Sequence, residues 1–196
     1  MRYQEIFEAQ VIDFNPQVTR QLFDLDLAGS RGALPEKLHK AFRQFLFANK
    51  NTTIRLYHGT SMKHDVANQG LLPTSSRRRL SLQSGSGYVY LTYDPMRALS
   101  FATMGYPSDK IFVIYAVEVP ICDLKPDPDQ LKNKRMWSDG HSAIGSSLAD
   151  SFIYGGGARV RGTIWPYQIS VYGYFDRSYH RIEPPVSPAP PPPSRP

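Results

Sequence analysis

Five short segments rich in β-branched and aromatic residues dominate the chain beyond Asn51, and they constrain the fold more than any other feature. They read TTIRLYHG, GYVYLT, KIFVIYAVEV, GARVRGTI and QISVYGYF. Such residues fit the pleated, half-buried surface of a sheet. Between the second and third segments, DPMRALSFATMG predicts a helix that Asp94 caps, with Pro95 at its first position. The pattern therefore indicates an α+β domain built on a sheet.

The 196 residues fit one domain with short appendages. From Leu34 to Phe47 apolar residues recur every three or four positions, which predicts an amphipathic helix with Pro35 in its first turn. We expect an N-terminal helical extension over 1–50, the main domain over 51–181 and a disordered, proline-rich tail over 182–196. The tail is interpreted as a solubilising end rather than a ligand for an SH3-like partner.

Charge and cysteine content narrow the class of protein. Cys122 is the single cysteine and the five histidines show no zinc spacing, so we expect neither a disulfide framework nor a metal. The N-terminus does not resemble a secretion signal and no apolar run is long enough for a membrane span, which predicts a cytoplasmic protein without a membrane partner. The net charge of +6 favours a polyanionic partner such as RNA or DNA.

Four motifs follow one another in the order of a known superfamily. They are LYHGTS at 56–61, GLLP at 70–73, GYVYLTYDPMRALSFA at 87–102 and GGARVRGTIWPYQI at 156–169. Together they resemble the ADP-ribosyltransferase superfamily, especially its HYE-type branch, which includes the poly-ADP-ribose polymerases and many bacterial and phage mono-ADP-ribosyltransferases. The resemblance implies a split β-sheet core and NAD as the ADP-ribose donor. The chain lacks a Rossmann glycine fingerprint and a phosphate loop, so NAD would not act as a hydride carrier.

The resemblance assigns NAD-binding roles to His58, Gly59 and Thr60. The imidazole of His58 can bond a ribose hydroxyl, and Gly59 can offer its N–H and C=O to the nicotinamide carboxamide. Tyr90 stands where HYE enzymes place their tyrosine and is also a catalytic candidate together with His58.

Two aromatic rings are expected to enclose the nicotinamide. Tyr90 and Phe101 would hold this flat cation between their faces through stacking and cation–π attraction. Tyr88 lies two residues before Tyr90 on the same strand face, so it is an alternative to Tyr90.

The carboxylate that the family uses to stabilise the transition state is absent from its usual place. The family pattern has a Glu at the start of the late strand, where this chain has glycines and an alanine at 155–158. The candidates to replace it are Asp127, Asp129, Asp139, Asp150 and Gln168. Of these we predict Asp150, because it precedes the glycine run and could reach the cleft if that loop folds back. Asp127 and Asp129 are interpreted as part of a solvated turn bounded by prolines.

Arginines supply the candidate acceptor contacts. Arg77, Arg78 and Arg79 form a basic loop between the first two core strands, which could grip the pyrophosphate or an RNA backbone or could equally be an exposed loop. Arg159 and Arg161 alternate along one strand face, where they could contact substrate or form a solvent-facing stripe. Trp137 and Trp165 are interpreted as core or rim anchors.

The leading prediction is an NAD-dependent mono-ADP-ribosyltransferase, a toxin, effector or defence protein that modifies RNA or DNA and that an antitoxin could neutralise. Three alternatives stay open. The first is ADP-ribosylation of protein targets, and the second is an RNA 2′-phosphotransferase, whose Arg-His-Arg-Arg signature this chain does not show. The third is a catalytically inactive NAD- or ADP-ribose-binding module that acts by occlusion.

Overall fold

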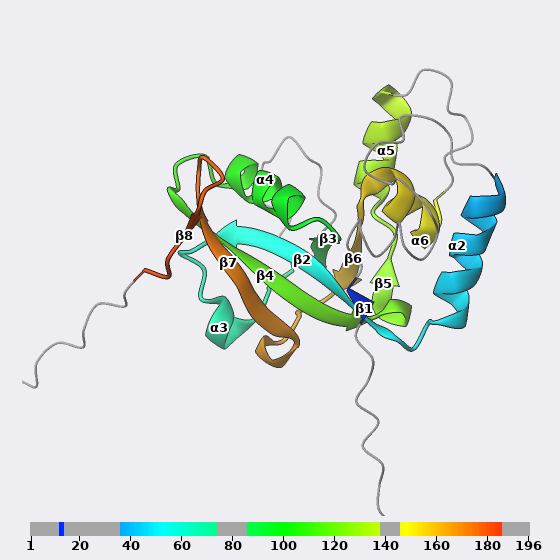
Figure 1. The fold of residues 1–196 in the computed structure, drawn as a ribbon, viewed down its shortest axis with the longest axis horizontal. Coiled ribbons are helices and arrows are strands. Elements are labelled where there is room, and N and C mark those ends of the chain that lie inside the picture. Colours follow the sequence, from blue (N-terminus) through cyan, green and yellow to red (C-terminus); the bar gives the residue numbers. More distant parts are fainter. Residues whose placement is uncertain (1–11, 14–35, 74–85, 138–145, 186–196) are drawn as a thin grey trace, which may run out of the picture.

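The computed structural model describes residues 12–13, 36–73, 86–137 and 146–185 (Figure 1). Most of the expected N-terminal extension and all of the tail beyond residue 185 lie outside these ranges. The described part combines helices with a largely antiparallel sheet, so the α+β fold class is confirmed.

One twisted sheet has the strand order β5-β6-β3-β2-β4-β7-β8, and β1 pairs with β2 in parallel. All five segments expected to be strands form strands. The bounds are β1 Ile12–Asp13, β2 Thr53–Ser61, β3 Tyr88–Thr92, β4 Ile111–Pro120, β5 Leu124–Lys125, β6 Gly157–Arg161, β7 Ile169–Asp176 and β8 Arg181–Ile182.

The helices flank this sheet (Figure 1). They are α2 Glu36–Ala48, α3 Val66–Gln69, α4 Pro95–Gly105, α5 Pro128–Trp137 and α6 Leu148–Asp150, and a π-helical turn, Ser151–Gly155, follows α6. The helix predicted over 34–47 is confirmed as α2. The predicted cap of α4 is also confirmed, because the Asp94 carboxylate accepts hydrogen bonds from the N–H groups of Met96 and Arg97 at 2.8 and 3.4 Å.

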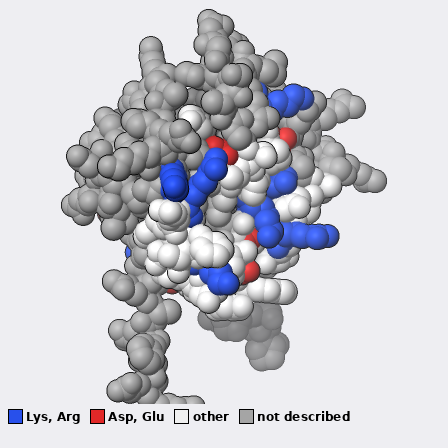
Figure 2. Space-filling model, turned by 90° about the vertical axis from the view of Figure 1, so that its right-hand side faces the viewer, with Lys and Arg blue, Asp and Glu red and all other residues white. Residues whose placement is uncertain are grey.

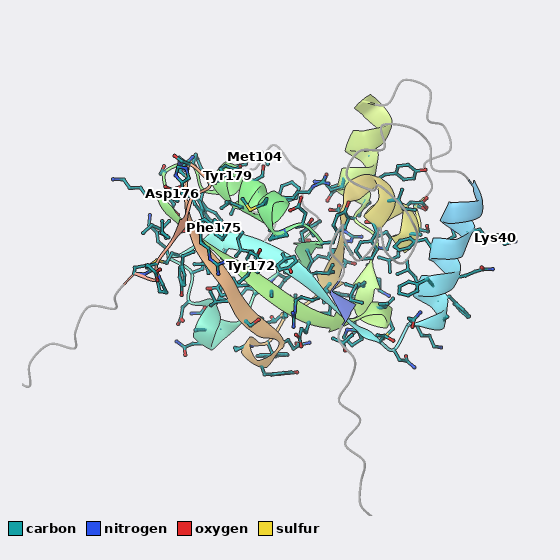
Figure 3. The ribbon with its side chains drawn as sticks, in the orientation of Figure 1. Lys40, Met104, Tyr172, Phe175, Asp176 and Tyr179 are labelled. Carbon is teal, nitrogen blue, oxygen red and sulfur yellow. The ribbon has the colours of Figure 1, made fainter. Side chains whose placement is uncertain are left out.

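Successive residues of β2 face opposite sides of the sheet and enter separate cores. Leu56 packs in the larger core with Phe42 and Leu46 of α2, whereas Tyr57 packs in the smaller core beneath α4. The smaller core extends along β4 and β7 to Phe175, whose ring stacks on that of Tyr172, and Tyr172, Phe175 and Tyr179 all lie in the half of the molecule away from α2 (Figure 3).

The sheet splits between β2 and β3. β2 pairs with β4 along its whole length, from Thr53–Pro120 to Ser61–Phe112. Its pairing with β3 is limited to the single pair Tyr57–Thr92, after which the two strands separate. This split opens the space in which the candidate site lies.

Candidate functional site

A cavity of about 420 Å³ lies at the split, a volume typical of small-molecule sites, which span roughly 300–1,000 Å³. Its walls come from β2, β3, α4, the 64–73 segment, the start of α5 and the glycine run. Among the expected site residues, the lining includes His58, Gly59, Thr60, Tyr90, Phe101, Asp127 and Asp129. The fold thus brings the two HYE-like motifs together around one cavity.

The imidazole of His58 has a defined tautomer. Its Nδ1 lies 2.8 Å from the carbonyl oxygen of Tyr90, and a carbonyl can only accept, so Nδ1 carries the proton and donates. Burial lowers the pKa of His58, an effect that outweighs the opposing hydrogen bond to Tyr90, and a nearby His64 lowers it further. The ring is therefore neutral at pH 7. Its Nε2 keeps a lone pair with which it can accept a hydrogen bond from a ligand hydroxyl.

The main-chain groups of Gly59 face away from β4. The N–H of Met62 bonds the carbonyl of Ile111 at 3.2 Å, and the N–H of Ile121 bonds the carbonyl of Thr52 at 3.1 Å. In an antiparallel ladder, alternate residues of a strand bond to the same neighbour. Even-numbered residues of β2 therefore bond to β4, and the N–H and C=O of Gly59 point to the opposite edge, towards β3.

At that edge the ladder stops one pair short of Gly59. After the pair Tyr57–Thr92, the next pair in the same register would join Gly59 to Tyr90, but the strands have already separated there. The Tyr90 carbonyl instead accepts the hydrogen bond from the His58 ring. Gly59 thus presents an N–H and a C=O to the cavity without a strand partner, an arrangement that can pair with a planar carboxamide.

Position 59 requires glycine because of helix packing. A Cβ at this position would overlap the carbonyl oxygen of Ala98 and lie 2.6 Å from its carbonyl carbon and 3.2 Å from the Cβ of Ala102. Glycine therefore lets α4 lie directly on β2. This contact also brings Phe101 of α4 to the cavity.

The two expected aromatic walls come from different elements. Tyr90 of β3 and Phe101 of α4 both line the cavity, and the guanidinium carbon of Arg97 lies 5.6 Å from the centre of the Phe101 ring. Tyr88, the alternative to Tyr90, does not line it. Its ring is covered by the guanidinium of Arg159, whose central carbon lies 3.9 Å from the ring centre. The structure thus favours Tyr90 over Tyr88.

Asp150 does not reach the cavity, contrary to the expected loop geometry. It is 1% exposed and closes a capping box at the start of α6, where its carboxylate accepts hydrogen bonds from the N–H and hydroxyl of Ser147 at 2.8 and 2.5 Å. Gly155, Gly156 and Gly157 line the cavity, whereas Asp150 does not. The structure therefore gives this carboxylate a role at the helix terminus.

Asp127 and Asp129 line the cavity instead, so their interpretation as a solvated turn is wrong. Asp127 is 5% exposed, and its carboxylate caps α5 by accepting hydrogen bonds from the N–H groups of Asp129 and Gln130 at 3.0 and 3.1 Å. Burial raises the pKa of Asp127 and the charge of Asp129 raises it further, while these hydrogen bonds and Arg159 oppose the rise. The carboxylate of Asp127 thus serves as the N-terminal cap of α5.

Asp129 is the carboxylate that hydrogen-bonds to Tyr90, one of the two aromatic residues of the cavity. The hydroxyl of Tyr90 donates a hydrogen bond to Oδ2 of Asp129 at 2.9 Å, and Asp129 is exposed to solvent more than Asp127 is. The sequence contains a signal for the start of α5, because Asp127–Pro128 has the same cap pattern as Asp94–Pro95 at the start of α4.

Two glycines of the run resist replacement by a larger residue such as the missing Glu. Gly156 has φ 69°, and a Cβ there would overlap the guanidinium of Arg97. A Cβ on Gly157 would overlap the carbonyl oxygen of Leu91 and lie 3.3 Å from the Cα of Thr92. Glycines stand where the family pattern has a Glu, and at Gly157 this small size allows the segment to pack closely on β3.

The remaining candidates lie elsewhere. Arg161 is exposed and borders a separate hollow beside β5 and β6 with Gln168, whose side-chain oxygen accepts a hydrogen bond from the N–H of Trp165. Trp165 is 56% exposed and is not a core residue. The predictions for Arg77, Arg78, Arg79, Asp139 and the Trp137 side chain lie outside the described residues.

No protein-family model matches this chain, and no curated protein matches it either. Among the described helices, none is long and apolar enough to cross a membrane. Within the same ranges, no group of three His, Cys, Asp or Glu side chains is arranged to hold a metal ion.

Proposed function

We propose that the protein is an NAD-dependent mono-ADP-ribosyltransferase that binds NAD in the cavity at the split of the sheet. The observation that carries this proposal is the combination of a neutral His58, the N–H and C=O of Gly59 without a strand partner, and the aromatic walls Tyr90 and Phe101 around one cavity. The glycine would bond the carboxamide, the histidine a ribose hydroxyl, and the rings the nicotinamide.

Asp129 supplies the carboxylate in this proposal. Asp127 is less suited because its oxygen already accepts two main-chain hydrogen bonds and burial raises its pKa. Asp129 is more open, and the Tyr90 hydroxyl holds its Oδ2. A carboxylate at this place stabilises positive charge on a ribose ring and can bond the 2′-hydroxyl.

The proposed reaction is a substitution at ribose C1′. The bond from C1′ to the nicotinamide nitrogen breaks, and its electron pair leaves with neutral nicotinamide. Positive charge develops on C1′ and the ring oxygen, next to Asp129. An acceptor oxygen or nitrogen then bonds C1′ and gives up its proton to a base or to water. The enclosing rings limit the competing attack by water.

Labelled NAD tests the proposal when it is incubated with separate pools of RNA, DNA and protein. The wild type should release nicotinamide and label one pool. His58→Ala should abolish labelling, and Asp129→Asn should lower the rate about a hundredfold or more with NAD binding retained. Asp150→Asn is the matched control, since it lies outside the cavity, and should stay active.

The outcomes separate the alternatives. NAD binding without nicotinamide release in any pool would indicate the inactive binding module, and the absence of NAD binding would refute the site. Equal activity of wild type and Asp129→Asn would remove Asp129 from the mechanism while leaving the function standing.

A further inference from the structure

The outer strands β3, β6 and β5 carry basic and aromatic side chains on one face. The register pairs Tyr88 with Arg161, Tyr90 with Arg159, and Lys125 with Arg159. Directly paired residues of neighbouring strands have side chains on the same face of the sheet. The intervening apolar residues of these strands point into the larger core: Val89, Leu91, Leu124, Ala158 and Val160. We call the opposite face, made of Tyr88, Tyr90, Lys125, Arg159 and Arg161, the basic face.

The cations of the basic face form no ion pair in the part of the chain that the structure describes. Lys125 and Arg161 are exposed there. Arg159 is half-buried against the Tyr88 ring, and its Nε is shielded from solvent without a hydrogen-bond partner. The charge of Arg159 lowers the pKa of Asp127, but the two side chains do not form an ion pair. A half-buried guanidinium without a counter-charge is costly, and an anion bound on its solvent-facing side would offset that cost.

The basic face is continuous with the cavity. Tyr90 belongs to both, since it lines the cavity while its main chain pairs with Arg159. Asp129, which accepts the Tyr90 hydrogen bond, also lines the cavity. An anionic chain held by Arg159 and its neighbours would therefore pass the point where ribose C1′ is exposed in the proposed reaction.

We infer that the basic face binds the phosphodiester backbone of a single-stranded nucleic acid and delivers one of its nucleotides to the cavity as the acceptor. This inference rests on the proposed function. Guanidinium and ammonium groups match repeated phosphates, and a base can stack on a guanidinium plane such as that of Arg159, which an acidic peptide would leave unused. A single strand fits because its bases are already unpaired.

The test compares two triple variants with the same loss of charge. The first is Lys125→Gln, Arg159→Gln and Arg161→Gln on the basic face. The control is Lys40→Gln, Arg43→Gln and Lys50→Gln, all exposed on or just after α2. Lys40 lies far from the split in Figure 3. The control is needed because the basic face is one of several places with exposed cations, and Figure 2 shows Lys and Arg side chains spread over the side of the molecule that faces right in Figure 1.

Fluorescence anisotropy with a labelled single strand of about 20 nucleotides, RNA and DNA in turn, measures binding at several salt concentrations. The basic-face variant should bind at least tenfold more weakly at low salt. Three lost phosphate contacts should also reduce the slope of log K against log salt by about 2. The control triple variant should change both quantities much less.

Equal weakening by the two triple variants would overturn the inference, as would wild-type binding of an acidic peptide or a duplex in preference to the single strand. The affinity for NAD, measured by titration calorimetry without nucleic acid, reports the proposed site separately, and the basic-face variant should retain it. If the wild type binds no NAD, the proposed function fails whatever the strand binding. The exposed Arg161→Gln alone keeps the Arg159–Tyr88 contact and provides a folded variant, which should show about one third of the slope change.

Discussion

Replacing Gly59 by alanine should destabilise the protein and weaken NAD binding together. The new Cβ would overlap the Ala98 carbonyl oxygen and lie 2.6 Å from its carbon, where ordinary contact begins near 3.4 Å. Both atoms are main chain, so no side-chain rotation relieves the overlap and α4 must move off β2. Overpacking of this kind costs about 1–3 kcal/mol.

A cost of about 2 kcal/mol corresponds to a fall in Tm of about 4–8 °C for a domain of this size. Thermal unfolding followed by circular dichroism measures it, and titration calorimetry measures the NAD affinity. The affinity should fall as well, because α4 carries Phe101, which lines the cavity. The smaller core under α4 would also loosen, since Ala98, Leu99 and Ala102 pack in it.

Gly162→Ala is the matched control. Gly162 has φ 83° and nothing within 4 Å of the position that a methyl group would take, so alanine there meets only backbone strain, about 1 kcal/mol, outside the cavity. NAD affinity should be unchanged in this variant. A Tm for Gly59→Ala within about 1 °C of wild type, or no greater loss than in Gly162→Ala, would refute the reasoning that α4 packs this closely on β2.

Three further predictions concern titration and capping. The pKa of His58 in the folded state lies below its ordinary value of 6.5, so the stability that the neutral ring contributes is present above pH 6.5 and is lost as pH falls. Urea unfolding from about pH 7.5 to about pH 5 should therefore show a steeper loss of folding stability in the wild type than in His58→Gln. The pKa of Asp127 is raised in the folded state, so the wild type loses folding stability as pH rises and this carboxyl becomes charged. Asp127→Asn keeps the capping oxygen but carries no charge, so its stability should rise relative to that of the wild type between about pH 4 and pH 7. A stability difference between the two that stays constant over this range would contradict the prediction. Asp94→Ala removes the acceptor for two N–H groups at the start of α4 and should cost about 1 kcal/mol in the same assay, whereas Asp94→Asn should cost much less.

Local pattern was enough to predict five of the eight described strands and the helices α2 and α4, and the family resemblance singled out His58, Gly59, Tyr90 and Phe101, which meet at the cavity. Strand and helix preferences depend on neighbours a few positions apart, and the cap at Asp94 lies within one turn of the groups it bonds. The roles of the site residues came from a resemblance, and the cavity supports those roles without testing them.

The tertiary structure decided which of the candidate carboxylates line the cavity. Asp129 meets Tyr90 from 39 positions further along the chain, while Asp150 turns back to Ser147, only three residues away. Spacing along the chain does not encode such distances, because they depend on where β3 separates from β2 and where α5 begins. The reason for glycine at position 59 and the pairing that places Arg159 beside Tyr90 depend in the same way on elements brought together only by the complete sheet.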